Sequence, residues 1–434
     1  CLEGAIPAVL ATCDAGGIPN VAYISQVFHA GESHVALSFQ FFNKTHHNIR
    51  ANPRATLLLI HPSTSAFYRL HIVYRRTESE GPLFQGMAAQ LAGIASHTGM
   101  EGVFRLLGAD VYEVEAIEQV AGEPLPAPPP PSSRLAALRV ASERMARSTS
   151  LDEMLGGVLA TLGDAFGMRH AMVLVHDAAG RKLYTVASSG YPTSGVGSEV
   201  RVGEGVIGVA ARERTPVRIL HMTNAALYSQ AVRSSFEREA PGIPPSTDIP
   251  YPGLQQPHSQ MAVPVLSAGR LLGVVFVESP CERQFGFEDE DALVTLAGHL
   301  GAAIDLLQAS ADSEPAVEAQ PPSRPAPGAT LQLRRFKAND SLFIDDRYLI
   351  KGVAGAILWK LARDHLQSGR TDFSNRELRL DPTLGLPDVT DNLEARLLLL
   401  QRRLQEHGPH LRIEKTGRGR FRLQVDRPLA LSEA

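Results

Sequence analysis

The sequence predicts a multidomain α+β protein, and three observations lead to this fold class. The chain has 434 residues, which favours two to four domains over one hydrophobic core. Two proline-rich stretches divide it into three segments of ordinary domain length. Within these segments, short apolar runs bounded by turn residues alternate with stretches in which apolar residues recur at helical spacing.

The dividing stretches differ in composition. Residues 122–133 include Pro126-Ala-Pro-Pro-Pro-Pro131, which predicts a stiff, extended linker because prolines fix the backbone and lack amide donors. Residues 309–329 contain no aromatic side chain and predict a flexible linker. The predicted domains therefore cover residues 1–121, 134–308 and 330–434.

Charge and cysteine content limit the function classes. The net charge is −4, but residues 331–434 hold 19 Lys and Arg against 14 Asp and Glu, a net of +5, so the rest carries about −9. A basic tail on an acidic body points to nucleic acid. The three cysteines, Cys1, Cys13 and Cys281, form no close pair, which favours a cytoplasmic setting without a metal site. Because 18 consecutive apolar residues and a basic-apolar leader are both missing, we expect neither a membrane span nor a signal peptide.

The first segment reads as closely spaced strands joined by tight turns, which predicts an antiparallel barrel. Short helices are expected at 44–51 and 84–95. The expected strands are 6–12, 20–27, 34–39, 55–60 and 68–74.

The first segment resembles the FMN-binding split barrel of the pyridoxamine-phosphate-oxidase-like superfamily. The resemblance depends on Gly17-Ile-Pro19, on residues 38–45 and on Asn52-Pro53. It implies that the start of the short helix, at Lys44 and Thr45, binds the flavin phosphate, and a helix N-terminus beside a lysine suits an anion. The other implied FMN contacts are Tyr23, Ser25, Gln26, Ser38, Phe39 and Arg69.

Two positions depart from the family pattern. Ala22 stands where a phosphate-binding arginine is usual, and Thr45 replaces one of two cations. Fewer charged contacts weaken phosphate capture, so FMN stays an open prediction and no catalytic residue is assigned. The pair His46-His47 is interpreted as a solvated helix face, because neighbours on a helix point about 100° apart. Haem, bound by some split-barrel relatives, is a minor alternative.

The middle segment has helical periodicity at 135–145 and 151–166, followed by strands at 172–176 and 182–188. Four motifs then follow in order, and together they resemble the GAF domain. They are Val202-Gly-Glu-Gly-Val-Ile-Gly208, Ser259-Gln-Met-Ala-Val-Pro264, Gly269-Arg-Leu-Leu-Gly273 and the amphipathic helix from Phe287.

The GAF resemblance implies a six-stranded antiparallel sheet with helices on one face and a small-molecule pocket on the other. Family ligands include cyclic nucleotides, bilins, haem and small metabolites, and the ligand of this chain stays unknown. The long proline-containing stretch 225–258 is either a binding loop or a disordered insertion. Helices at 134–149 and 288–307 flank the domain, and the family commonly pairs such helices in a homodimer.

The last segment predicts strands at 331–337 and 341–349, a helix at 353–366, a second helix that starts with a Ser374–Glu377 capping box, and a third at 391–406. A glycine-containing hairpin ends it. This order predicts a winged helix and resembles the DNA-binding effector domain of response regulators. The resemblance implies recognition-helix contacts from Arg396, Gln401, Arg402 and Arg403, and hairpin contacts from Lys415, Arg418 and Arg420.

Leu398, Leu399 and Arg420 depart from that family's usual residues, so a winged helix that binds protein is the alternative. A DNA complex would weaken steeply with salt and a protein complex would not. The common phosphate-loop, serine-hydrolase and zinc-protease motifs are missing from the sequence.

The predicted function is therefore a ligand-responsive transcriptional regulator, in which the GAF domain, with flavin in the split barrel, controls DNA binding. The alternative is a flavin-dependent oxidoreductase with regulatory domains.

Overall fold

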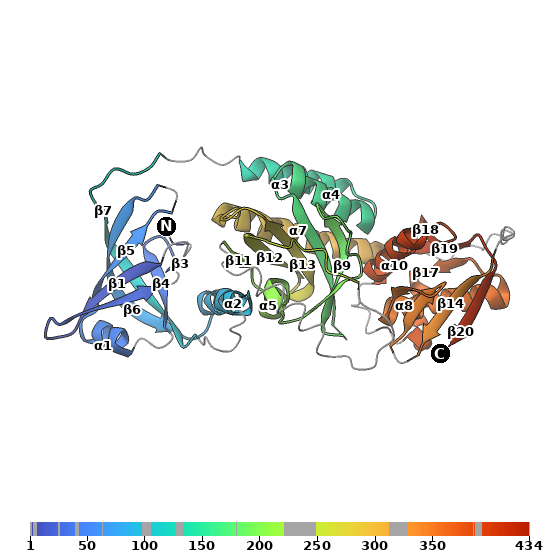
Figure 1. Cartoon of the computed structure of the whole chain (residues 1–434), viewed down its shortest axis with the longest axis horizontal. Coiled ribbons are helices and arrows are strands. Elements are labelled where there is room, and N and C mark those ends of the chain that lie inside the picture. The colour runs from blue at the N-terminus through green and yellow to red at the C-terminus, as the bar shows by residue number, and fades with distance from the viewer. Residues whose placement is uncertain are drawn as a thin grey trace.

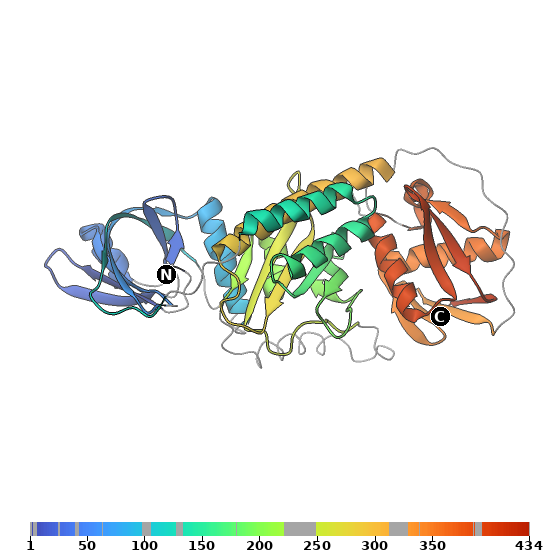
Figure 2. The same ribbon diagram turned by 90° about the horizontal axis from the view of Figure 1, so that it is seen from above.

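The chain folds into three units that follow one another along its long axis, as the computed structural model shows (Figure 1). A curled N-terminal sheet occupies one end, a six-stranded sheet the middle and a smaller α+β unit the other end, and the view from above keeps this order (Figure 2). This architecture confirms the multidomain α+β prediction. The structure describes residues 2, 7–24, 27–39, 43–62, 64–97, 106–126, 133–178, 180–220, 249–311, 329–337, 339–384, 386 and 393–433.

The N-terminal sheet is antiparallel, with the strand order β2-β1-β5-β6-β7-β4-β3. Burial alternates along its strands, so that Leu10, Leu57 and Ile72 fill the inside of the curl. The helix α1 (Asn43–Ala51) packs beside β1 and β2. The strands are β1 (Ala8–Cys13), β2 (Pro19–Ile24), β3 (Val27–His29), β4 (His34–Phe39), β5 (Arg54–Ile60), β6 (Phe67–Glu78) and β7 (Gly108–Gln119).

The middle sheet is antiparallel in the order β10-β9-β8-β13-β12-β11. Its strands are buried on both faces: Val275 and Val277 point to one core, whereas Val274 and Phe276 point to another. The strands are β8 (His170–Asp177), β9 (Lys182–Ser189), β10 (Glu199–Arg201), β11 (Val217–Ile219), β12 (Ser259–Ser267) and β13 (Arg270–Ser279). The helices are α3 (Arg134–Arg147), α4 (Leu151–Asp164), α5 (Gly205–Glu213) and α7 (Phe287–Ala311).

The helix α2 (Pro82–His97) belongs to the first segment in sequence but packs on the middle unit, beside α5 and β11. Both ribbon views place it between the two units. Ala89 lies in the core on the α5 side of the middle sheet. Gln90 donates to the carbonyl of Arg218 and accepts from its amide. A helix of the first segment therefore covers part of the middle sheet. The sequence did not reveal this packing.

The helix α7 is long and apolar enough to cross a membrane by length and composition alone, although the sequence contains no uninterrupted apolar run of that length. One side of the helix is buried: Leu293, Leu296 and Leu300 lie in the core of the middle unit. Its apolar character therefore has a structural explanation as a core helix of a folded domain.

The C-terminal unit combines two sheets with three α-helices. The strand expected at 341–349 is instead a hairpin, which turns at Asp345 and Asp346 with φ of 47° and 65°. The capping box of Ser374 and Glu377 is confirmed. The strand orders are β16-β15-β14-β20 and β17-β19-β18. The elements are β14 (Leu331–Phe336), β15 (Ser341–Ile344), β16 (Arg347–Ile350), α8 (Gly352–Ser368), β17 (Asp372–Ser374), α9 (Asn375–Leu380), α10 (Leu393–His407), β18 (Leu411–Gly417), β19 (Arg420–Val425) and β20 (Leu429–Glu433).

Candidate functional site

The candidate site is the helix α10, which carries four of the seven residues predicted to meet DNA. One side of this helix packs on α8 and β18 of its own unit, and another side packs on α4 and β9 of the middle unit. Leu398 and Leu399 are buried, so these departures from the family pattern are core positions in this chain.

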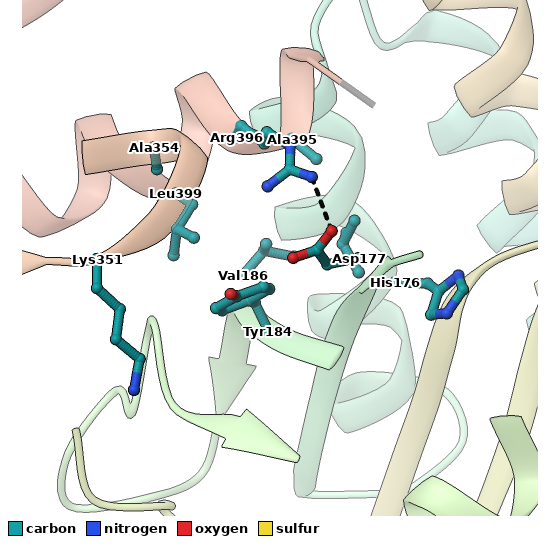
Figure 3. Close-up of a pocket in the computed structure, with 10 residues that line it drawn as sticks. His176, Asp177, Tyr184, Val186, Lys351, Ala354, Ala395, Arg396 and Leu399 are labelled. Atoms are coloured by element: carbon teal, nitrogen blue, oxygen red, sulfur yellow. Dashed lines mark hydrogen bonds and ion pairs between the residues drawn. The ribbon is translucent and has the colours of Figure 1, made fainter. Parts of the chain in front are cut away.

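Arg396 forms a buried ion pair across the boundary between the two units. Its Nη2 lies 3.0 Å from Oδ1 of Asp177, and the two side chains are only 9% and 10% exposed. Figure 3 shows the guanidinium reaching from α10 toward this carboxylate, with the ring of Tyr184 beside it. Burial raises the pKa of the Tyr184 hydroxyl, and the negative charges of Glu199 and Asp177 raise it further. The Tyr184 hydroxyl is therefore neutral at physiological pH.

A small cavity lies beside this ion pair, lined mainly by apolar groups that include Val186, Ala354, Ala395 and Leu399. Its volume is about 20 Å³, which has room for a single water molecule. Among the residues drawn in Figure 3, His176 points away from the pair. The boundary is therefore closely packed, and this cavity is too small for an organic ligand.

Arg402 bonds to two groups of the middle unit. Its Nη2 and Nε lie 2.5 and 3.1 Å from Oδ1 of Asp152, and its Nη1 donates to the carbonyl of Val186 at 2.6 Å. Asp152 stands in the first turn of α4, after the N-cap Ser150, where a carboxylate also favours the helix dipole. The guanidinium thus uses all three of its nitrogens at this boundary.

Two further contacts complete the boundary. Glu199 of β10 receives Lys351 at 3.2 Å and Lys182 at 2.7 Å. The hydroxyl of Ser194 donates to Glu406 of α10. Carboxylates of the middle unit therefore meet cations of the C-terminal unit at three places, since Glu199 adds to the two aspartates.

The remaining predicted DNA contacts fall into two groups. Arg403 is buried and bonds within its own unit, to the carbonyl of Leu349 at 3.0 Å and to Glu406 at 2.5 Å. Gln401 lines a cleft of about 230 Å³ together with Lys415 and Arg420, and residues 150–152 of the middle unit also line it.

The hairpin cations are more accessible than the helix cations. Lys415 lies 3.5 Å from Glu394 and is 39% exposed. Arg418 is exposed, and Arg420 is half-buried. The structure thus brings Gln401, Lys415 and Arg420 to one cleft, while Arg396 and Arg402 are bonded to the middle unit.

In the N-terminal sheet, the structure brings the end of β4 to the start of α1. The ring of Phe39 stacks on His46 with centroids 4.2 Å apart, and half-buried Ser38 precedes it. Lys44 is exposed on the first turn of α1, and the buried Thr45 accepts from Nδ2 of Asn20 at 3.0 Å. Four of the predicted FMN contacts therefore lie together: Ser38, Phe39, Lys44 and Thr45.

The other predicted FMN contacts are separate from this group. Tyr23 is 74% exposed. Arg69 aligns with Tyr23 across β1 and β5, so both lie on the outer face of the sheet, and Arg69 pairs with Glu118 at 2.9 Å. Ser25 and Gln26 lie outside the described residues.

The interpretation of His46-His47 as a solvated face is wrong for one of the two rings. His47 is exposed, but Nε2 of the half-buried His46 accepts from Nε of Arg50 at 3.0 Å. The other ring nitrogen, Nδ1, lies 3.6 Å from the buried Asp110, whose pKa is raised by burial. Asp110 lies on β7, a strand that the sequence analysis did not predict. Within the described part of the chain, three or more His, Cys, Asp or Glu side chains nowhere gather as a metal site would require.

A buried polar group that no sequence pattern had indicated lies on the α5 side of the middle sheet. Glu278 is almost fully buried and accepts from the amide of Leu254 at 2.7 Å and from Nε2 of Gln260 at 3.0 Å. Burial raises the pKa of this carboxyl group. It ties the end of the predicted binding loop to the sheet; residues 225–248 of that loop lie outside the described residues.

Comparison with known proteins identifies two of the three units. Residues 1–117 match the family model of pyridoxamine 5'-phosphate oxidase, and residues 148–305 match that of the GAF domain. The chain contains a pyridoxamine-phosphate-oxidase-like split barrel and a GAF domain. The split-barrel and GAF resemblances stated from the sequence are thus confirmed, whereas the winged-helix resemblance of the C-terminal unit stays a prediction. No curated protein matches the chain.

Several solved structures are similar to part of this chain. The GAF domain of an Acinetobacter phosphoenolpyruvate-protein phosphotransferase is 23% identical, covers 42% of this chain and 97% of its own, and gives a TM-score of 0.32. Free methionine-R-sulfoxide reductase from Neisseria meningitidis is 22% identical over 41% and 93%, with a TM-score of 0.30. An FMN-binding protein from Syntrophomonas wolfei is 18% identical over 27% and 80%, with a TM-score of 0.24.

Proposed function

We propose that this chain is a ligand-responsive transcriptional regulator of the cytoplasm, in which the GAF domain controls DNA binding by a C-terminal winged helix. The C-terminal unit begins with strands, continues with the helices α8 to α10 and then forms the β18–β19 hairpin. This order supports the winged helix. In such domains the last helix enters the major groove, and the hairpin meets the adjacent backbone. A small molecule bound by the GAF domain is the proposed signal.

The observation that carries the proposal is the cleft between α10 and the hairpin. Gln401 from the helix and Lys415 and Arg420 from the hairpin line this one cleft, so the residues proposed to contact base edges and backbone lie on one side of the unit. A recognition helix and wing need this arrangement, because the phosphate backbone runs beside the groove that the helix enters.

A variant with Lys415→Ala and Arg418→Ala is expected to bind duplex DNA more weakly and with a shallower salt dependence. Each lost phosphate contact should reduce the slope of log affinity against log salt by about 1, and thus by about 2 for the pair. The measurement is fluorescence anisotropy of the full chain, titrated onto a duplex from upstream of its own gene at several salt concentrations.

The matched control removes two cations from exposed positions of the split barrel, with Arg75→Ala and Arg76→Ala. These residues lie on β6 and pair with Glu113 and Glu78, and Figure 1 shows β6 far from the C-terminal unit. Equal slopes for the hairpin variant and this control would argue against the DNA proposal and favour a winged helix that binds protein.

A homodimer formed through α3 and α7 is part of the proposal. These helices pack on each other, and Ser142 of α3 bonds to His299 of α7 at 3.0 Å. They also expose four large apolar side chains, Leu135, Phe287, Val294 and Leu306. A second copy of the chain would cover such side chains.

A second candidate function is a flavin-dependent oxidoreductase, favoured by the match of residues 1–117 and by the surroundings of Lys44. The helix N-terminus and the exposed Lys44 fit the phosphate of FMN, and Thr45 stands beside them. Arg69 does not fit as a free cation, because Glu118 already pairs with it. When bound, a flavin supplies hydride and electron transfer; Lys44 and Thr45 would hold its phosphate.

FMN is expected to bind the purified chain, and Lys44→Ala to weaken that binding about tenfold, as the loss of one charged hydrogen bond implies. Quenching of flavin fluorescence on titration measures the affinity. Lys337→Ala, at an exposed lysine of the C-terminal unit that pairs with Glu433, is the control. A protein that is colourless and does not respond to added FMN would rule out the oxidoreductase.

A further inference from the structure

We propose that the docked arrangement of α10 is an autoinhibited state, in which carboxylates of the GAF domain occupy the arginines that would otherwise bind DNA. The inference rests on the proposed function, since it concerns the same DNA-binding face. It adds how that face is regulated: the sensor domain itself competes with DNA for α10.

Asp152 and Asp177 compete chemically with DNA phosphates for the arginines of α10. An aspartate presents two oxygens to a guanidinium much as a phosphate does, and arginine binds either with the same planar set of donors. Arg402 has donors on Asp152 and on the carbonyl of Val186, and Arg396 has a donor on Asp177. Because these contacts involve every nitrogen of Arg402, it cannot bind a phosphate in the same way until Asp152 and Val186 leave.

The start of α4 also blocks the approach of DNA to α10 sterically. Residues 150–152 at the start of α4 form one wall of the cleft whose other residues include Gln401 and Lys415. A major groove about 12 Å wide has to surround a recognition helix for its side chains to reach base edges. The start of α4 stands in that space, so DNA can enter only after α10 and α4 separate.

The contact between α10 and the GAF domain is weak enough to be reversed. Asp152 is 59% exposed, and an ion pair with so exposed a partner contributes little to stability. Most of the ionic contact strength then falls on the two more buried pairs, Arg396 with Asp177 and Lys351 with Glu199. A contact within one chain that depends on a few ion pairs and apolar side chains is suited to a switch.

The GAF sheet also offers a route from its ligand side to this contact. Asp177 ends β8 and Val186 lies in β9, and the same strands carry Leu174 and Leu183, which face the core beneath α5. A ligand on the α5 side that prefers a different strand arrangement would therefore act directly on the residues that bind α10. Such a ligand shifts the equilibrium only by its difference in affinity for the two states.

The test uses the full chain with Asp152→Asn and Asp177→Asn. The DNA affinity of this variant is expected to rise at least tenfold over that of the unaltered chain. The control removes the same number of negative charges from exposed positions of the GAF domain with Asp164→Asn and Asp291→Asn, which lie on α4 and α7. Asp152→Asn alone, at the more exposed site, provides a second variant that leaves the buried pair intact and should show a smaller rise.

A second readout does not depend on DNA. Trp359 is the only tryptophan of the chain and is buried in α8 of the C-terminal unit, so its fluorescence follows the unfolding of that unit in urea. Substitutions in the GAF domain that release α10 should lower this urea midpoint, because the C-terminal unit loses a docking partner.

The outcomes separate the two proposals. Higher DNA affinity together with a lower Trp359 midpoint supports autoinhibition. An unchanged DNA affinity in the released variant, when the unaltered chain binds DNA, overturns autoinhibition and leaves the regulator standing. No DNA binding by either protein, with a lowered midpoint, overturns the proposed function and autoinhibition with it. An equal rise in the DNA affinity of the Asp164 and Asp291 control would mean that the effect comes from net charge alone, and this would overturn the inference.

Discussion

Gly208→Ala is expected to lower the free energy of unfolding of the GAF domain by about 3 kcal/mol, the upper part of the range for overpacked cores. Gly208 is buried in α5, and a Cβ there would lie 2.2 Å from the carbonyl oxygen of Arg201 and 2.9 Å from the amide nitrogen of Gly203. Both are backbone atoms, so no side-chain rotation relieves the clash. The amide of Gly203 also donates to the carbonyl of Gly208 at 2.7 Å, which fixes the close approach.

The matched control is Gly156→Ala in α4 of the same domain. A Cβ at Gly156 would meet nothing within 4 Å, and alanine is favoured over glycine in a helix interior by about 1 kcal/mol. Scanning calorimetry of the full chain should therefore show the GAF transition at a lower temperature for Gly208→Ala and at an equal or higher one for Gly156→Ala. Similar shifts for both variants would contradict the tight contact of α5 with the strand before it.

Gly208 also illustrates what the sequence could predict. Its motif at 202–208 is one of the four that resemble the GAF domain, and its closely spaced glycines are typical of a turn; the structure has β10, a turn and α5 in that order. The same holds for the Ser374 capping box and for the strand 34–39. These elements follow from signals among neighbouring residues: turn glycines, caps and apolar periodicity.

The features that were missed depend on contacts between distant parts of the chain. The packing of α2 on β11 joins residues more than a hundred positions apart, as the bonds of Gln90 to Arg218 show. The strand β20 pairs in parallel with β14 across the whole C-terminal unit. Neither contact leaves a signal among neighbouring residues, because the position of α2 or β20 depends on a segment far away in the sequence.

Only part of the candidate site could be predicted, because the other part again depends on contacts between distant segments of the chain. Helix α10 and its arginines could be located from the sequence, and so could the hairpin. Asp152 and Asp177, however, read as an ordinary first-turn residue of a helix and an ordinary turn residue. Only the folded chain shows that they meet Arg402 and Arg396.

Breaking the buried pair is expected to weaken the C-terminal unit more than breaking the exposed one. Arg396→Met leaves Asp177 buried without its cation, and such a loss costs about 3 kcal/mol or more. Arg402→Met removes an ion pair whose carboxylate is mostly exposed, which is worth about 1 kcal/mol or less, and with it the hydrogen bond to the carbonyl of Val186. Urea unfolding of the full chain, followed by Trp359 fluorescence, measures both losses in the unit that contains the tryptophan.

A double-mutant cycle shows whether the loss comes from the pair itself. Asp177→Asn alone should lower the stability reported by Trp359 although the substitution lies in the GAF domain. Combined with Arg396→Met, it should cost clearly less than the sum of the single variants, because neither charge is then left buried alone. Additive losses would mean that Arg396 and Asp177 act separately. A large coupling instead means that the buried pair of Arg396 and Asp177 is a principal contact by which the sensor domain holds α10, so that a change in the position of β8 acts directly on that contact.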